Sequence, residues 1–267
     1  MNKPTDREVY LCAIKRYGRN VKLVQFAVVA GFVTLWEVLA QTGVIDDFIF
    51  SSPSRIWNVF VTMAQADLAK HILITVLETV AGFAAGVVLG LAISVALWFF
   101  PFADRVASPF LVVLGSLPKI AMGPVIIVWA GAGIKAIIVM AVAISLIVTV
   151  LELSGGFAST DKNLITTVQS FGATKGQIFT KVVLPANIPV LFGSLKVNIA
   201  LSLVGVIAGE FLVSKSGLGY LIVYAGQVFR MDLVMMSVVI LAVVAFAMDK
   251  GVSAARKIVE KKINHDN

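Results

Sequence analysis

Charged residues are scarce in this chain, and their scarcity indicates whether it is a soluble or a membrane protein. Only 14% of the 267 residues are charged, 59% are apolar, and the mean hydropathy is +0.95. Soluble domains carry about 25% charged and 45–50% apolar residues. The composition therefore excludes an ordinary soluble domain and indicates an integral membrane protein. Because a spanning helix needs about 20 apolar residues, the chain has room for roughly five to seven spans in one membrane domain.

Cysteine and histidine, the residues that most often form disulfides or bind metals and haem, are also few. Cys12 is the lone cysteine, and His71 and His265 are the two histidines. This excludes an intrachain disulfide, a thiolate metal cluster and the paired axial histidines of a haem scaffold. The sequence holds no GxxxxGK[ST] phosphate loop, so we expect ATP to be hydrolysed elsewhere. We predict no catalytic residue, no metal and no cofactor.

The apolar runs predict an all-α membrane protein, a bundle of six transmembrane helices. The six predicted spans are residues 23–40, 71–100, 106–130, 134–151, 189–213 and 233–248. They form one membrane domain, residues 23–250, between basic tails at residues 1–22 and 251–267. A short amphipathic helix with Ile56, Trp57, Phe60 and Val61 on its apolar side is expected to lie at the membrane interface.

The distribution of basic residues predicts the orientation. Lys and Arg give the chain its formal net charge of +7, and they gather in the two tails and in the polar loop 153–186 rather than in one patch. We therefore expect no nucleic-acid partner. The positive-inside rule places these segments in the cytoplasm. An even number of spans agrees, since it leaves both termini on one side of the membrane.

The polar loop has an internal pattern of its own. Leu164, Val168 and Phe171 share one helical face after the N-cap candidate Asp161. Gly172 then ends the first helix, and a second helix over residues 174–183 is expected to end at Leu184-Pro185, because proline disfavours α at the preceding residue. Two interpretations stay open at this point: a loop packed on its own membrane domain, or a docking site for a soluble partner.

Two features inside the spans suggest roles. Gly82, Gly86 and Gly90 form a ridge of small residues on one helical face, which predicts close packing with another helix. Ionisable residues within spans are functional candidates, and the sequence places six of them there: Glu37, Glu78, Lys119, Glu152, Lys196 and Glu210. Lys119 follows the helix-breaking Pro118 near the middle of its span. We hypothesise that Pro118 and Lys119 line a translocation path.

The polar loop resembles the cytoplasmic loop of permease subunits of binding-protein-dependent ABC importers. The match in identity and spacing lies in Gly172 and Leu184-Pro185. The family's Glu-Ala-Ala positions hold TTV here, and the ATPase-coupling residues implied by the resemblance are Thr166, Thr167, Val168, Phe171, Gly172, Ala173, Leu184 and Pro185.

Four further stretches, in order along the chain, resemble the nitrate/sulfonate/taurine branch of that family. They are WE at 36–37, SPS at 52–54, SLPKIA at 116–121 with WAG at 129–131, and GEF at 209–211 with GLGYLI at 217–222. The resemblance implies the type I importer permease fold in the bacterial inner membrane. Glu210, one of the ionisable residues within the spans, is a further candidate for the translocation path together with Pro118 and Lys119.

The resemblance also implies partners. These are ABC ATPase subunits, a periplasmic or lipid-anchored solute-binding protein, membrane lipid and a second copy of the permease in a homodimer. The solute would be a nitrate-, sulfonate- or taurine-like anion or a vitamin precursor. A standalone channel or secondary transporter is the alternative, but it would leave the amphipathic loop without a role. A membrane-embedded enzyme would need a polar catalytic cluster, which the sequence lacks.

Overall fold

The computed structural model describes residues 6–64 and 67–263, and every regular element among them is helical. The outermost parts of both basic tails, with His265, lie outside the described residues. The helices are α1 (Asp6–Gln41), α2 (Asp47–Phe50), α3 (Pro53–Ala64), α4 (Leu68–Phe99), α5 (Pro101–Ser116), the 3-10 turn η1 (Lys119–Met122), α6 (Gly123–Ala130), α7 (Ile134–Ala158), α8 (Lys162–Ser170), α9 (Lys175–Ile178), the π-helical turn η2 (Phe179–Val183), α10 (Leu184–Ala186), α11 (Ile188–Val213), α12 (Leu218–Gln227) and α13 (Met231–Ile263).

Within the described residues, five helices are long and apolar enough to cross a membrane: α4, α7 and α11 in full, with Arg16–Gln41 of α1 and Met231–Ile258 of α13. The sixth predicted span, residues 106–130, is not one straight helix. Its two halves, α5 and Lys119–Ala130, meet at 88°. The break lies at Leu117, whose ψ of 141° is extended because Pro118 follows it. The bundle therefore has six spans when this bent pair counts as one.

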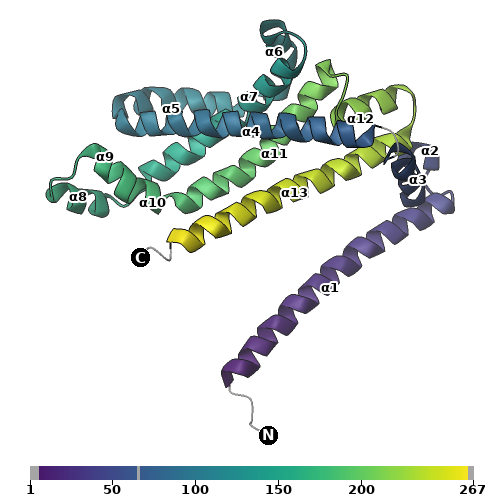
Figure 1. The fold of residues 1–267 in the computed structure, drawn as a ribbon, viewed down its shortest axis with the longest axis horizontal. Helices are drawn as coiled ribbons and strands as arrows, with labels where there is room; N and C mark the ends of the chain where they lie inside the picture. Colours follow the sequence, from purple (N-terminus) through teal and green to yellow (C-terminus); the bar gives the residue numbers. More distant parts are fainter. Residues whose placement is uncertain (1–5, 65–66, 264–267) are drawn as a thin grey trace.

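Helix α7 lies at the centre of the bundle, between α4 and α11 (Figure 1). Gly82, Gly86 and Gly90 of α4 lie against Ala141, Ser145 and Thr149 of α7. A methyl group at Gly82 would lie 2.5 Å from the Ala141 Cβ, and one at Gly90 would lie 2.6 Å from the Thr149 Cβ. These distances leave no room for a side chain, so the glycines set the close approach of the two helices.

Two glycines of α11 also pack closely on α7. A methyl group at Gly205 of α11 would lie 2.6 Å from the Ala141 Cα, and one at Gly209 would lie 2.9 Å from the Ile137 Cα. Ala141, which is fully buried, is therefore the closest neighbour of glycines from both flanking helices. Backbones pack this closely in membrane bundles because lipid supplies no hydrophobic drive to bring the helices together.

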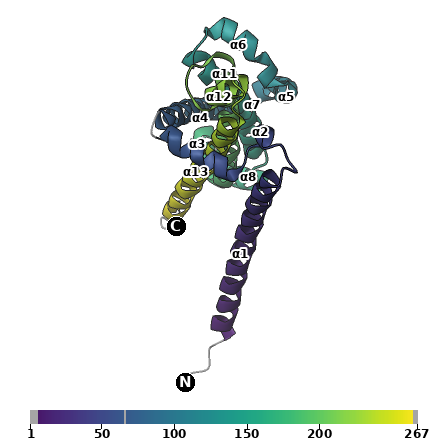
Figure 2. The same ribbon diagram turned by 90° about the vertical axis from the view of Figure 1, so that its right-hand side faces the viewer.

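Helix α1 projects away from the bundle, as the two orthogonal views in Figures 1 and 2 show. It is fastened near its C-terminal end, where the Glu37 Oε2 accepts a 3.0 Å hydrogen bond from the Ser54 backbone N–H of α3. The predicted short helix before the second span is present as α3, which buries Ile56 and Val59 and leaves Trp57 exposed.

Candidate functional site

Helices α8 to α10 form the helix–glycine–helix segment that the sequence predicts. The Asp161 Oδ1 caps α8 by accepting a 2.8 Å hydrogen bond from the Asn163 N–H. The segment then reverses at Gly172, whose φ of +79° lies in the left-handed region. Glycine enters that region without the steric cost of a Cβ, so the sharp turn depends on this residue.

A reciprocal cap begins α9 and fixes the turn from the other side. The Thr174 N–H donates to the Gln177 Oε1 at 2.8 Å, and the Gln177 N–H donates to the Thr174 Oγ1 at 3.4 Å. Our reading of the sequence missed this capping box. The Thr-x-x-Gln spacing after a glycine could have found it.

The segment has one face turned outward and one face packed inward. Phe171 at the turn is 86% exposed, and Leu164 in α8 is also exposed. Ile165 and Val168 instead pack against the buried cluster below. The hydroxyls of Thr166 and Thr167 bond back to backbone carbonyls of α8, at 2.8 Å each. A large aromatic ring held in the open on a fixed turn is a surface that a partner protein can bind.

The inner face is anchored by Phe179 in the π-helical turn. Its ring centroid lies 5.0 Å from that of Trp98, 5.6 Å from that of Phe99 and 5.4 Å from that of Phe157. Trp98 and Phe99 end α4, and Phe157 lies in the last turn of α7. Four aromatic rings therefore join the segment to the ends of two spans, and we call them the aromatic cluster.

The expectation that Leu184-Pro185 ends this helix is wrong. Leu184 is helical, with φ −62° and ψ −48°, and the chain continues as α10 to Ala186. A proline inside an α-helix clashes with the carbonyl four residues earlier. The π-helical turn over Phe179–Val183 widens the backbone just before Pro185 and so removes the reason for the helix to stop.

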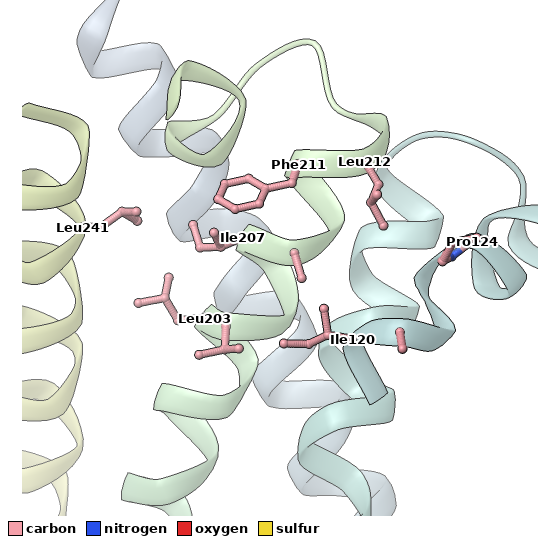
Figure 3. A pocket seen from close by; sticks show the side chains of 10 residues that line it. Ile120, Pro124, Leu203, Ile207, Phe211, Leu212 and Leu241 are labelled. Carbon is pink, nitrogen blue, oxygen red and sulfur yellow. The ribbon is translucent and has the colours of Figure 1, made fainter. Parts of the chain in front are cut away.

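Pro118 and Lys119 lie in the bend between α5 and α6. Pro118 is exposed and Lys119 is half-buried. The Lys119 Nζ donates a 2.8 Å hydrogen bond to the Gly115 carbonyl, which the break leaves without a helical partner. The next residues border an apolar groove of about 580 Å³ between η1, α6, α11 and α13, lined by Ile120, Pro124, Leu203, Ile207 and Phe211 among others (Figure 3).

Glu210 lies near the end of α11 and is only 1% exposed. Its Oε1 accepts a 2.6 Å hydrogen bond from the Thr75 Oγ1, and its Oε2 accepts a 2.5 Å hydrogen bond from the Gly219 N–H. The Thr75 Oγ1 in turn accepts from the Leu218 N–H at 2.8 Å. The Glu210 carboxylate thus ties the turn between α11 and α12 to α4. Gly217, with φ +110°, packs directly on that carboxylate, where a Cβ would clash.

Glu78 lies one helical turn beyond Thr75 on α4 and is 5% exposed. Unlike Glu210, it has an oxygen, Oε2, without a hydrogen-bond partner among the described residues. No three His, Cys, Asp or Glu side chains gather at metal-binding distance in the part of the chain that the structure describes.

These features have close parallels in known proteins. Residues 82–265 match the family described as "Binding-protein-dependent transport system inner membrane component", which is more than half of the chain. The chain belongs to this family. It is a membrane-spanning permease subunit of an ABC importer, as the resemblance of the polar loop implied.

Individual relatives of the chain are also named as transporter permease proteins. A probable ABC transporter permease protein of Haemophilus influenzae is 27% identical to the permease over 86% of this chain and 94% of its own length. The taurine transport system permease protein TauC of Escherichia coli is 22% identical over 90% and 89%. This second relative supports placement in the nitrate/sulfonate/taurine branch.

A solved structure supports the fold. The MetNI methionine ABC transporter in inward-facing conformations contains a chain with a TM-score of 0.58 and 22% identity, covering 70% of the permease and 95% of that chain. This likeness shows the fold alone, which is that of type I importer permeases.

The permease also contains features that the sequence reading missed. The pair Gly205 and Gly209 has the Gly-xxx-Gly spacing of a close helix contact, a signal we used for α4 but not for α11. The aromatic cluster carries no comparable signal, because Trp98, Phe157 and Phe179 lie far apart along the chain and meet only in the folded bundle.

Proposed function

We propose that the permease takes its energy from ABC ATPase subunits that dock on Lys162–Ala186 and opens a path for a small solute. A periplasmic or lipid-anchored solute-binding protein would deliver that solute, and a second copy of the permease would complete the path as a homodimer. The observation that carries this proposal is the pairing of an exposed Phe171 with a firmly anchored Phe179 on one rigid segment.

The anchoring gives the segment a way to transmit motion. A docking surface on a loose loop would absorb any movement of the ATPase. Here the turn is fixed by Gly172 and the Thr174 capping box, and the aromatic cluster joins it to the last turns of α4 and α7. A shift of the segment therefore moves two spans as well. Interfaces packed in this way switch between discrete arrangements rather than deform continuously.

The path proposal rests on the bend in the third span. Irregular backbone at membrane depth is tolerated where it faces protein or a water-filled cavity. Pro118 and Lys119 form such a bend, and the Lys119 ammonium would favour anionic or polar solutes. Glu210 contributes to the same path by holding the α11–α12 turn against α4.

The orientation follows from the basic residues. The tails at residues 1–22 and 251–267 and the loop 153–186 would lie in the cytoplasm, with the domain over residues 23–250 in the inner membrane. Large apolar side chains are exposed along α1, α4 and α5, for example Phe26, Leu73 and Phe110. Such surface is suited to lipid and to the second permease copy. The solute class that fits the branch is a nitrate-, sulfonate- or taurine-like anion or a vitamin precursor.

Purification in a gentle detergent tests the proposal. The tagged permease should bring down an ATP-hydrolysing subunit identified by mass spectrometry, and Gly172→Pro should lose it, since proline cannot adopt φ +79°. Gly176→Ala is the matched control, because this glycine lies in the same segment with open space around it. A permease that purifies alone and transports without ATP would instead support a standalone transporter.

A further inference from the structure

The segment Lys162–Ala186 carries charge of one sign only. It contains no aspartate or glutamate, and its basic residues are Lys162, Lys175 and Lys181. All three lysines are exposed, and none of them forms an ion pair among the described residues. The nearest acidic residue along the chain, Asp161, is engaged as the cap of α8. The segment therefore presents ammonium groups that are available to a partner.

Two of these lysines occupy positions that a helix disfavours. Lys162 is the first residue of α8, and Lys175 is the first residue of α9, which continues without a break through η2 and α10. The first turn of a helix carries unpaired N–H groups and the positive end of the helix dipole, so it favours carboxylates over ammonium groups. Neither first turn contains an acidic residue. Lysines that oppose local stability at two helix starts indicate a role outside the folding of the segment.

The placement of the apolar side chains favours a protein partner over the membrane surface. A helix that lies on a membrane needs a free apolar face beside its basic residues. In this segment the apolar face already packs against the bundle through Ile165, Val168, Ile178 and Phe179. The large apolar side chains that stay exposed there are Leu164 and Phe171. An exposed aromatic ring among polar and basic side chains is typical of a protein interface, where an anchor residue is surrounded by a polar rim.

We propose that the surface of the ATPase subunit that receives Phe171 is rimmed by acidic side chains, which pair with Lys162 and Lys175. The inference rests on the docking role proposed above and adds the chemistry of the partner surface. Complementary charge at the rim of an interface speeds association and rejects wrong partners. An ATPase subunit with basic residues at those positions would be repelled. The two lysines thus select the partner of the permease rather than stabilise its fold.

Charge variants of the full-length permease test this in gentle detergent. The probe is the ATP-hydrolysing subunit that co-purifies with the wild type, titrated onto each variant at low and at high NaCl concentration. We expect Lys162→Glu combined with Lys175→Glu to bind this subunit about 10-fold more weakly than the wild type at low salt, because each exposed pair changes from attraction to repulsion. The corresponding double glutamine variant should bind with intermediate affinity. At high salt the differences should shrink, since exposed charges are screened.

Two further measurements separate partner selection from a structural role. Lys257→Glu is the matched control, because Lys257 is an exposed lysine of α13 outside the segment, and this variant should bind as the wild type does. The double glutamate variant places carboxylates at two helix starts, so its midpoint of thermal unfolding should equal or exceed that of the wild type. Weaker binding without a lower midpoint is a result that purely structural lysines would not give.

Three results would overturn the proposal. The first is wild-type binding by the double glutamate variant at low salt. The second is a loss of binding that Lys257→Glu reproduces or that a lower unfolding midpoint accompanies. The third comes from amine-reactive labelling in nanodiscs of phosphatidylcholine, where the bound ATPase subunit should protect Lys175. Protection that requires anionic phospholipid instead of the ATPase would assign the lysines to the membrane surface.

The inference and the docking proposal can fail separately. If Gly172→Pro loses the ATPase subunit while both double variants retain it at every salt concentration, the segment is the docking site and the acidic rim is wrong. If the wild type retains no ATPase subunit at any salt concentration, the docking proposal fails and the inference fails with it.

Discussion

The ring of Phe179 in the π-helical turn packs on the ring of Trp98 at the end of α4, with centroids 5.0 Å apart. This contact joins the polar segment to a membrane span through two side chains that lie far apart in the sequence. Phe179 is 6% exposed. The segment is thus part of the bundle on its inner face and available to a partner on its outer face.

Replacing Phe179 should uncouple the segment from the spans. Phe179→Ala removes three ring contacts and leaves a cavity, which costs about 3 kcal/mol of unfolding free energy in comparable cores. We expect a lower midpoint of thermal unfolding in detergent. In reconstituted vesicles we also expect ATP hydrolysis without matching solute uptake. Uptake that stays proportional to hydrolysis would contradict the coupling role.

Phe171 should behave in the opposite way. Its ring is 86% exposed, so Phe171→Ala should leave the midpoint of unfolding within error of wild type. An aromatic anchor lost from a protein interface costs about 2 kcal/mol or more, so the amount of ATPase subunit retained on purification should fall. Full retention by this variant would show that the docking surface lies elsewhere.

The glycine contacts around α7 give a test of the bundle itself. Gly205→Ala would push a methyl group to 2.6 Å from the Ala141 backbone, where neither helix can yield without moving apart. We expect a large loss of folded permease in detergent, measured by size-exclusion chromatography. Gly193→Ala in the same helix has open space and is the control. Equal yields from the two variants would refute the packing argument.

Much of this bundle could be predicted from local pattern. The apolar runs located every span, and Pro118 located the break, because proline acts on the residue beside it. The 88° angle at that break could not be predicted, since it depends on how α6 packs against α7 and α11. The end of the segment at Pro185 was predicted wrongly, because nothing in the sequence signals that a π-helical turn will precede this proline.

Some features of the candidate sites could likewise be predicted from local sequence pattern, and others could not. Gly172 and Phe171 follow from spacing along one segment. The Thr75–Glu210 hydrogen bond instead joins α4 to α11 through two residues that are 135 positions apart. Such contacts are set by the register of packed helices, which periodicity alone does not determine.

The hydroxyl of Thr75 should be essential for the turn after α11. It donates to Glu210 and accepts from the Leu218 N–H, so Thr75→Val would remove one hydrogen bond from the buried Glu210 carboxylate and the one that Thr75 accepts from the Leu218 N–H. We expect a loss of about 1–3 kcal/mol in unfolding free energy. Thr79→Val is the control, because that equally buried hydroxyl bonds only to the Thr75 carbonyl of its own helix. Equal stability of the two variants would count against the proposed tie.

Lys119 provides a test of the path. Lys119→Ala removes the ammonium group and its hydrogen bond to the Gly115 carbonyl, which is a half-buried contact at the bend rather than one in the core. We expect impaired solute uptake in vesicles that contain the assembled transporter, with the ATPase subunit still bound. Wild-type uptake by this variant would exclude the role of Lys119 in the path.

Site-directed cross-linking at the turn tests the central claim most directly. In a Cys12→Ser background, Phe171→Cys places a single thiol on the exposed turn, and Val44→Cys places one at an exposed position between α1 and α2 as the control. The account predicts that a thiol cross-linker joins position 171, but not position 44, to the ATPase subunit, and that adding ATP changes the yield. If position 171 gives no more cross-linked ATPase than position 44, the segment Lys162–Ala186 is not where the permease is driven.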